Sequence, residues 1–203
     1  MGKYIGPKSK IARKFGEAIY GADKVLEKRN YPPGQHGLAR KRKKNSEYGE
    51  QLSEKQKAKY TYGILEKQFA RTYEAAARMG GITGENLLKL LECRLDNVVW
   101  RMGMASTRRE ARQLVTHAHF TVNGKKANIP SMMVKVGDVV AVKESFRSSA
   151  QCKALAEALQ GKITAKWLDV DKTALSAKVV ARPARDDIDF EVDEQLVVEL
   201  YSK

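Results

Sequence analysis

Cationic and hydrogen-bonding side chains recur at helical spacing in the middle of the sequence. Arg108, Arg109 and Arg112 are followed by Gln113 and His117. A guanidinium can grip two phosphate oxygens or stack on a base, while amide and imidazole groups can hydrogen-bond to sugars or base edges. An isolated helix of this kind is often just a solvated face, but here two lysines follow it beyond a tight turn. We therefore interpret this region as a nucleic-acid-binding surface.

A helix and a hairpin must position these side chains. Thr107 is a typical helix N-cap, and Glu110 follows three residues later, as in a capping box. Asn123 and Gly124 favour a two-residue hairpin turn between short strands. The helix start also offers free backbone amides and partial positive charge. From these elements and the helix that precedes them, the expected RNA-binding residues are Arg94, Arg101, Thr107, Arg108, Arg109, Arg112, Gln113, His117, Asn123, Lys125 and Lys126.

Apolar periodicity predicts further elements on both sides of this region. Ser53 and Gln56 are spaced as a capping box for a helix that Gly80 ends, and residues 83–102 form one helix or two short ones meeting near Glu92. The remaining expected segments are a strand at 139–142, a short helix at 154–159, strands at 167–168 and 178–181, and an apolar segment at 196–200.

The positive charge is concentrated near the amino terminus. The chain has 38 Lys and Arg against 24 Asp and Glu, a net charge of +14, which makes a polyanion the first partner to consider. Residues 1–45 hold 13 of the cations and only 3 of the acids, whereas residues 151–203 carry 8 cations and 10 acids. The sequence is therefore polarised, with its cationic end first.

The densest basic block is the run Arg40, Lys41, Arg42, Lys43 and Lys44. Such a block repels itself and is expected to stay extended until phosphates neutralise it. A lone block could equally be a solvated face or a targeting patch. The neighbouring segment 31–37 contains prolines that stiffen the chain and glycines that allow close backbone approach. That combination favours a chain that threads along RNA.

Composition argues against several other function classes. No run of about 18 apolar residues is present, so we expect no membrane contact. The amino terminus lacks the apolar core and cleavage site of a secretory signal, and two cysteines give no disulfide framework, so we expect a chain that starts mature in the cytoplasm. The acidic run 186–194 could be a metal-binding carboxylate cluster, but a solvated face or a protein contact fits it better.

Several segments together resemble one known family. Residues 107–115, followed by Val-Asn-Gly-Lys at 122–125, are similar to the RNA-binding module named after protein four of the small ribosomal subunit. Further segments resemble the bacterial form of that family itself, so the resemblance covers nearly the whole chain. These segments are 31–37, 60–69, 83–91, 94–103, 166–171 and 196–203.

The resemblance implies an α+β fold with three parts. The expected parts are an extended basic segment at 1–44, a helical domain at 45–90 plus 186–203, and a mixed domain at 91–185. In the mixed domain, paired helices pack on an antiparallel sheet, and the module spans about 94–142. Some relatives carry four amino-terminal cysteines that bind zinc, but this chain has none before Cys93. Cys93, Cys152 and three scattered histidines cannot build a tetrahedral site, so we expect no metal and no cofactor.

The resemblance also implies a function. A member of this family is a structural constituent of the small ribosomal subunit that binds its ribosomal RNA directly at a multi-helix junction and supports assembly. Its expected partners are that RNA, protein five of the same subunit, other neighbouring ribosomal proteins and the messenger RNA near its entry channel. An influence on translational accuracy and a place in the small ribosomal subunit of the cytoplasm follow from the same resemblance.

An RNA-modifying enzyme is the main rival, because the module also occurs in pseudouridine synthases and some aminoacyl-tRNA synthetases. Arg94-Leu95-Asp96 is similar to part of the synthase catalytic motif, but Cys93 replaces the preceding glycine and too few residues remain for a catalytic domain. We therefore expect no enzyme activity, and we interpret Asp96 as a partner for Arg94 or a neighbouring arginine. A free RNA chaperone or a messenger-binding repressor also remains compatible with the sequence.

Overall fold

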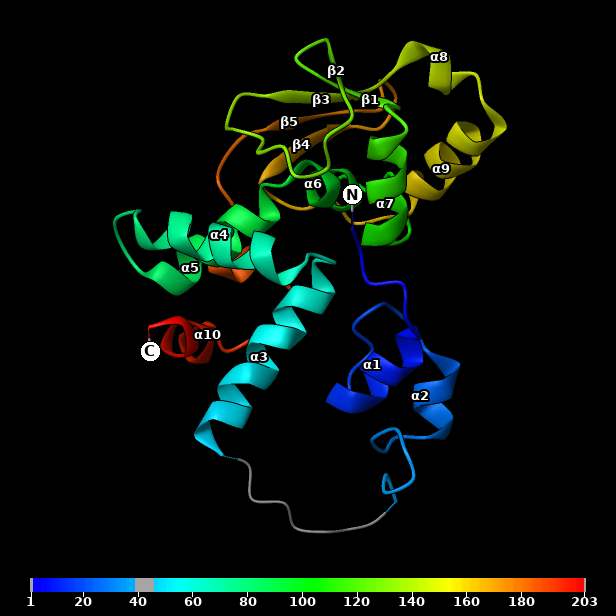
Figure 1. The fold of residues 1–203 in the computed structure, drawn as a ribbon. Coiled ribbons are helices and arrows are strands. Elements are labelled where there is room, and N and C mark those ends of the chain that lie inside the picture. Colours follow the sequence, from blue (N-terminus) through cyan, green and yellow to red (C-terminus); the bar gives the residue numbers. More distant parts are fainter. Residues whose placement is uncertain (1, 39–45, 203) are drawn as a thin grey trace. The chain divides into compact units, whose positions relative to one another are not determined.

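The computed structural model describes residues 2–38 and 46–202, and its elements are shown in Figure 1. The helices before the sheet are α1 (Lys8–Phe15), α2 (Lys24–Lys28), α3 (Glu47–Thr61), α4 (Glu66–Ala77), α5 (Thr83–Glu92), α6 (Leu95–Arg101) and α7 (Arg108–Thr116). The strands are β1 (Phe120–Val122), β2 (Lys125–Ala127), β3 (Val139–Val142), β4 (Leu168–Asp171) and β5 (Ser176–Val179). The other helices are α8 (Glu144–Arg147), α9 (Ala150–Gln160), the 3-10 turn η1 (Arg185–Asp187) and α10 (Glu194–Tyr201).

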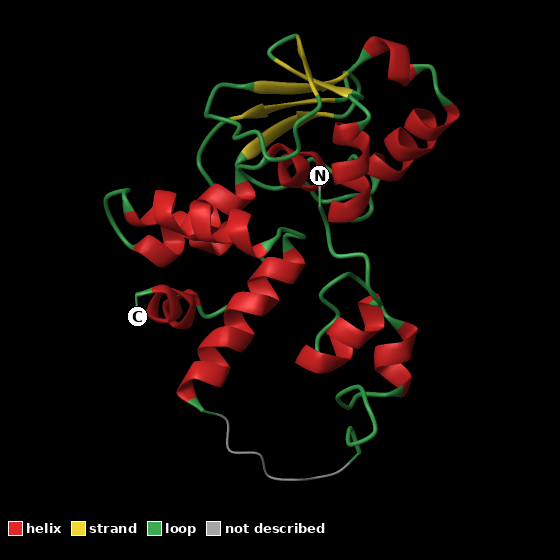
Figure 2. Ribbon diagram, in the orientation of Figure 1, coloured by secondary structure: helices red, strands yellow, loops and turns green. Residues whose placement is uncertain are grey.

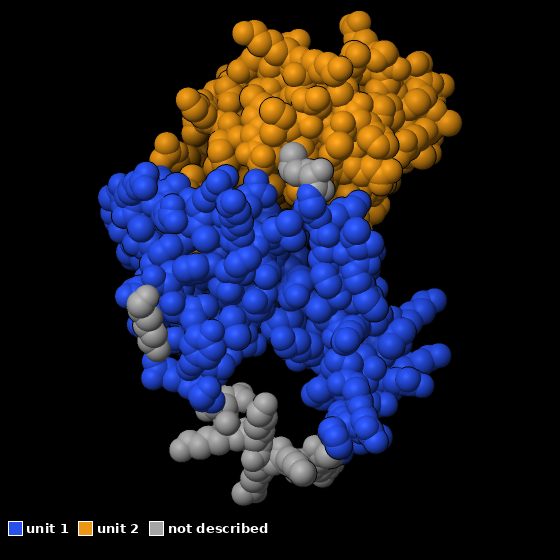
Figure 3. Space-filling view, viewed as in Figure 1, with its two compact units in different colours: residues 1–84, 190–203 blue, residues 85–189 orange. Residues whose placement is uncertain are grey.

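The chain forms two compact units, which Figure 3 colours separately. Unit 1 comprises residues 1–84 and 190–203, and unit 2 comprises residues 85–189. Both the chain's beginning and its end therefore belong to unit 1. The expected mixed domain, 91–185, lies a few residues inside the limits of unit 2. The segment 1–44, expected as a separate extension, groups with unit 1.

Unit 1 is helical, and its last helix packs against its longest one. Helix α10 packs against α3, and Tyr201 of α10 stacks on Tyr73 of α4 with ring centroids 4.6 Å apart. Ser46 caps α3 by accepting a hydrogen bond from the Gly49 amide. The prediction that Ser53 starts this helix is wrong, because Ser46 provides the same capping group about two turns earlier. A left-handed Gly63, with φ of +64°, then separates α3 from α4.

The amino-terminal segment is partly folded. Within residues 2–38, α1 and α2 replace the expected extended chain. Helix α1 buries Ile11 and Ala12, and Asp23 caps α2 through bonds from two backbone amides, so local apolar burial and capping offset the charge repulsion. The basic run Arg40, Lys41, Arg42, Lys43 and Lys44 lies outside the described residues.

Unit 2 is built on a fully antiparallel sheet with strand order β2-β1-β3-β5-β4 (Figure 2). Alternate residues of the strands point into the core, as Phe120 and Val122 do on β1 and Val140 and Val142 do on β3. Helices α6 and α7 lie on that side of the sheet (Figure 1) and contribute Val98, among others, to the same core. The fold is therefore α+β, as predicted.

Most predicted elements of unit 2 are present with shifted ends. Residues 83–102 form two helices that meet at Cys93 and Arg94, one of the two expected alternatives. The helix expected at 154–159 extends over 150–160, and strands β4 and β5 start one residue later and two residues earlier than expected. The apolar segment near the carboxyl end, in unit 1, is helix α10. Element ends are the least predictable feature because capping and packing decide them.

Candidate nucleic-acid interface

The paired helices α6 and α7 meet across a tight turn at Gly103. Gly103 has a φ of +89°, which favours glycine, and a Cβ there would lie 2.5 Å from a Leu159 side-chain carbon. The Lys162 ammonium supports the turn by donating to the carbonyl oxygens of Gly103, at 3.0 Å, and Ala105, at 3.3 Å. The turn is therefore a fixed feature that sets where α7 starts.

Thr107 begins α7 as predicted. Its hydroxyl accepts a hydrogen bond from the Glu110 amide, and the Glu110 carboxylate accepts one from the Ser106 amide at 2.7 Å. Ala111 and Val115 on the inner side of α7 are fully buried. The hydroxyl of Thr107 is thus used as a helix cap.

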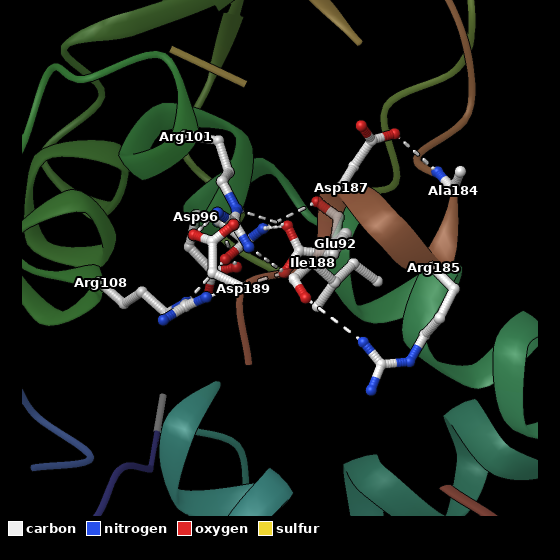
Figure 4. A network of polar contacts seen from close by, with 10 residues as sticks. Glu92, Asp96, Arg101, Arg108, Ala184, Arg185, Asp187, Ile188 and Asp189 are labelled. Atoms are coloured by element: carbon white, nitrogen blue, oxygen red, sulfur yellow. Dashed lines mark hydrogen bonds and ion pairs between the residues drawn. The ribbon is translucent and has the colours of Figure 1, made fainter. Parts of the chain in front are cut away.

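A buried carboxylate organises the end of α5 and the start of α6 (Figure 4). Glu92 has no exposed surface, and its carboxylate accepts hydrogen bonds from Arg101 at 2.8 and 3.1 Å and from Asn97 at 2.7 Å. Asn97 and Arg101 are four residues apart on α6, so both face Glu92. Arg101 also donates to Asp189 at 2.7 Å. Burial alone would lower the pKa of Arg101. The hydrogen bonds to Glu92 and Asp189 and the charges of these two acids outweigh burial and raise the pKa above its usual range.

A second buried carboxylate joins α6 to α7. Arg94 donates to both oxygens of Asp96, at 3.1 and 2.9 Å, and Arg112 donates to the same carboxylate at 3.0 Å. All three side chains are buried. The prediction that Asp96 pairs with Arg94 or a neighbouring arginine is confirmed. Because Asp96 is enclosed by two arginines, its carboxylate is not open to a substrate, which argues against a catalytic role.

Three arginines expected on the RNA-binding surface therefore lie inside unit 2. Arg94, Arg101 and Arg112 are only 3%, 8% and 8% exposed. They are turned inward because two buried carboxylates need cationic partners and these arginines supply them. Their role in the structure is to hold α5, α6 and α7 together.

Arg108 lies between the buried arginines and the surface of unit 2. Its Nε donates to the Asn97 side-chain oxygen at 2.8 Å, a terminal nitrogen lies 3.7 Å from Glu92, and its guanidinium lies 3.8 Å from the Trp100 ring centroid. The side chain is 18% exposed. Arg108 is thus oriented by the buried network and by a cation–π contact, with a small part of its surface open.

The side chains that remain on the outside of the module come from one side of α7 and from the hairpin. Gln113 and His117 are exposed, and Arg109, which is half-buried, lies four residues before Gln113 on the same side of the helix. Lys125 and Lys126 are exposed on β2, which is an edge strand. These residues are the part of the predicted site that can meet a large partner.

The hairpin that carries the two lysines has the predicted turn. Asn123 and Gly124 have φ values of +50° and +78°, as a type I′ turn requires. The Asn123 amide group donates to Asp138 at 2.8 Å and accepts from the Val139 backbone at 2.9 Å. Asn123, expected to contact RNA, therefore has its side chain engaged in fixing the hairpin against β3.

An imidazole cluster lies where α7 leads into β1. His119 stacks on Phe146 with ring centroids 3.9 Å apart, and His117 meets His119 edge to face at 5.8 Å. Burial, then the nearby charges of His117 and Lys143, lower the pKa of His119. His119 is therefore mainly a packing residue, while His117 stays accessible.

Sequence reasoning does not identify Glu92, Asn97 and Trp100 as members of this site. Each sits within an apolar stretch, where a polar or aromatic side chain looks like one more position of a helical face. The available signal is a carboxylate next to a helix break, because a buried acid requires a buried cation nearby. Burial and the Glu92 charge raise the pKa of the neighbouring Cys93 to about 11, so its thiol stays protonated at neutral pH.

The described residues contain neither a candidate metal site nor a candidate membrane-spanning helix. Within 2–38 and 46–202, no group of three or more His, Cys, Asp or Glu side chains is placed to hold a metal ion. No described helix is both long enough and apolar enough to cross a membrane.

Comparison with known proteins decides the family. A family model for the ribosomal protein S4/S9 N-terminal domain matches residues 3–92, and a model for the S4 domain matches residues 93–140. The small ribosomal subunit protein uS4 of Parabacteroides distasonis is 58% identical over 205 residues, with full coverage of both chains. The chain belongs to the ribosomal protein S4 family.

Other S4-family proteins match equally well along their whole length. The uS4 proteins of Bacteroides thetaiotaomicron and Christiangramia forsetii are 58% and 57% identical, again with full coverage of both chains. The S4-domain match begins at the helix break at Cys93 and ends within β3, so it contains α6, α7 and the hairpin. The segment predicted from sequence as the RNA-binding module is therefore the S4 domain of this chain.

Proposed function

We propose that this chain is a structural component of the small ribosomal subunit that binds its ribosomal RNA directly through the S4 domain. The observation that carries the proposal is the sequence identity of 58%, over the full length of both chains, to proteins named for that subunit. The exposed cations and hydrogen-bonding groups of unit 2 support it, because A-form RNA is recognised largely through phosphates, 2′-hydroxyls and shape. A net charge of +14 favours the same partner.

The RNA-facing set that we propose is smaller than the one predicted from sequence. It consists of Arg109, Gln113, His117, Lys125 and Lys126, with Arg108 at its margin. This set is positioned by three buried arginines, Arg94, Arg101 and Arg112, which hold α6 and α7 in place. The run 40–44 stays a predicted RNA contact, on charge alone.

The finer parts of the function are proposed from the family resemblance. They are binding at a multi-helix junction, support of assembly, contacts with protein five of the subunit, a place near the messenger RNA entry and an effect on accuracy. The proposed working parts are the basic segment 1–44, the helical part 45–90 with 186–203, and the mixed part 91–185. The acidic run 186–194 fits a contact with a basic neighbouring protein.

The direct test measures RNA preference. The full chain is titrated with a transcript of small-subunit ribosomal RNA and with an RNA of equal length and shuffled sequence, at the same salt concentration. We expect clearly tighter binding to the ribosomal transcript, and retention of the protein on small subunits after a high-salt wash. Equal affinity for both RNAs together with loss on washing would overturn the proposal.

A further inference from the structure

A groove lies beside the proposed RNA-facing hairpin, and neither the family matches nor the proposed function assigns it a ligand. It is formed by β2 and by the segment that follows it, and its volume is about 320 Å³. Its walls combine two methionines, Met132 and Met133, with three lysines, Lys125, Lys126 and Lys135. One acidic residue, Asp138, also lines it.

The groove is held in a fixed shape by main-chain hydrogen bonds. The amides of Leu95 and Asp96 donate to the carbonyl oxygens of Met132, at 2.8 Å, and Pro130, at 3.1 Å. The Val134 amide donates to the Cys93 carbonyl oxygen at 2.9 Å. The segment 130–134 is thereby anchored to the start of α6, so a ligand would meet a preformed surface.

The groove and the chain segment that forms it carry several exposed apolar side chains. Met132 and Met133 are 38% and 39% exposed, and the same chain segment carries Ile129 and Val136, which are more than half exposed. A cluster of exposed apolar side chains with a polar rim usually marks a binding surface. Methionine in particular adapts to varied flat ligands through its flexible, polarisable thioether.

The charges around the groove select the kind of ligand. Three lysines favour an anion at the rim. Asp138, another lining residue, accepts hydrogen bonds on its carboxylate from the Lys135 amide and from Asn123, both at 2.8 Å, and these bonds lower its pKa, so it is ionised at neutral pH. A carboxylate repels phosphate but can accept further bonds from N–H groups of a base. The ligand that satisfies both parts has anionic phosphates and a flat base with N–H donors.

We propose that this groove holds one unstacked nucleotide of the bound ribosomal RNA, with its base against Met132 and Met133 and its phosphates on Lys125 and Lys126. The inference rests on the proposed function, because it names a nucleotide of the same RNA. A protein strand added to the edge of β2 fits less well, since β2 has only three residues and two of them are lysines. Recognition of splayed bases is the usual route to sequence preference in RNA binding.

Methionine oxidation provides the first test. The full chain is treated with dilute peroxide, free and bound to a transcript of small-subunit ribosomal RNA, and each methionine sulfoxide is quantified by mass spectrometry. We expect Met132 and Met133 to be oxidised readily in the free protein and, once covered by a base, several times more slowly in the complex. Met102 and Met104, which are fully buried, should resist oxidation in both states and serve as internal controls.

The outcomes separate this inference from the proposed function. If the transcript binds but the groove methionines react as fast as in free protein, the nucleotide site is wrong while the proposed function stands. If the transcript does not bind preferentially, the proposed function fails first. If protection appears only in the assembled subunit and not in the RNA complex, a protein occupies the groove and the inference is overturned.

Substitution provides the second test. Met132→Ala with Met133→Ala should lower affinity for the transcript about tenfold, because the thioether contacts of two methionines with one base are lost. The salt dependence should stay unchanged, because no charge is removed. Ultraviolet crosslinking of the wild-type complex should join segment 128–138 to a single unpaired nucleotide. Ile163→Ala, which removes an almost fully exposed apolar residue outside this groove, is the control.

A variant of matched length guards against misfolding. Met132→Gln with Met133→Gln keeps the side-chain reach but replaces the apolar surface, and its circular dichroism spectrum should equal that of the wild type. Its affinity should fall as in the alanine variant. Unchanged affinity in both folded variants, or crosslinks only to base-paired nucleotides, would overturn the inference.

Discussion

The Arg112 guanidinium donates a 3.0 Å hydrogen bond to the Asp96 carboxylate inside unit 2 and is only 8% exposed. A residue with the spacing of an RNA-binding side chain is thus a structural tie between α6 and α7. Removing one partner of a buried ion pair leaves an uncompensated charge, which is more costly than removing an exposed pair. The structure therefore separates the arginines that hold the S4 domain together from the side chains that stay exposed on α7 and the hairpin.

Arg112→Ala should destabilise the protein by about 3 kcal/mol, because Asp96 keeps only Arg94 as its cationic partner. Urea unfolding followed by circular dichroism measures the decrease. Gln113→Ala is the control on the same helix, and it should leave the unfolding free energy nearly unchanged, because Gln113 is exposed, while weakening RNA binding. Equal stability of the two variants would show that the buried pair contributes nothing.

Gly103→Ala should lower the unfolding free energy by about 1–3 kcal/mol, because alanine is strained at a φ of +89° and its Cβ would crowd Leu159. Gly161→Ala is a suitable control, since its φ is −88° and no atom lies within 4 Å of the added Cβ. Thermal melts of both variants check the prediction. A similar melting temperature for the two would mean that the Gly103 turn is not under this constraint.

Sequence predicts those features of the site that depend on neighbouring residues, and it fails for those that depend on distant ones. The Thr107 cap and the Asn123-Gly124 turn follow from neighbouring residues alone, and both are as predicted. The direction of an arginine is not local, because it depends on which buried acid needs a partner. On α7, Arg112 follows Ala111 and lies beside the apolar side, whereas Arg109 and Gln113 lie away from it.

The division of the chain into two units is also hard to predict from sequence, because it too depends on contacts between distant residues. The pairing of α10 with α3 joins residues far apart in the sequence, and only the family resemblance indicates it. Helix α1 is not predicted because its many cations outweigh the short apolar pair, Ile11 and Ala12, that it buries. Where a few apolar side chains decide the structure, composition is a poor guide.

The stability of unit 1 should fall as the solution is acidified below about pH 4.5. Burial alone would raise the pKa of Glu66, but hydrogen bonds from Lys55, Tyr201 and Lys59 bring it down from 4.5 to about 2. Since the folded pKa is the lower one, the stabilisation is complete above pH 4.5 and disappears as pH falls toward 2. Urea unfolding at a series of pH values measures this change.

Glu66→Gln is the variant that isolates this effect. It should be less stable than the wild type at neutral pH and should show a smaller decrease in stability between pH 4.5 and 2, because one acid with a lowered pKa is gone. Glu74→Gln, at an exposed position of the same helix, controls for the change of charge. A wild-type-like acid response in Glu66→Gln would contradict the assignment.

The most direct test of the account is the salt dependence of binding to a small-subunit ribosomal RNA transcript. For the full chain, log affinity should fall steeply with log salt, and Lys125→Ala with Lys126→Ala should make the slope shallower by about 1.4 to 1.8, or roughly 0.7 to 0.9 for each phosphate that is no longer neutralised. Lys153→Ala, at an exposed position on α9, should leave the slope unchanged. A double variant whose slope and affinity equal those of the wild type would contradict the claim that the S4 domain binds RNA through its hairpin.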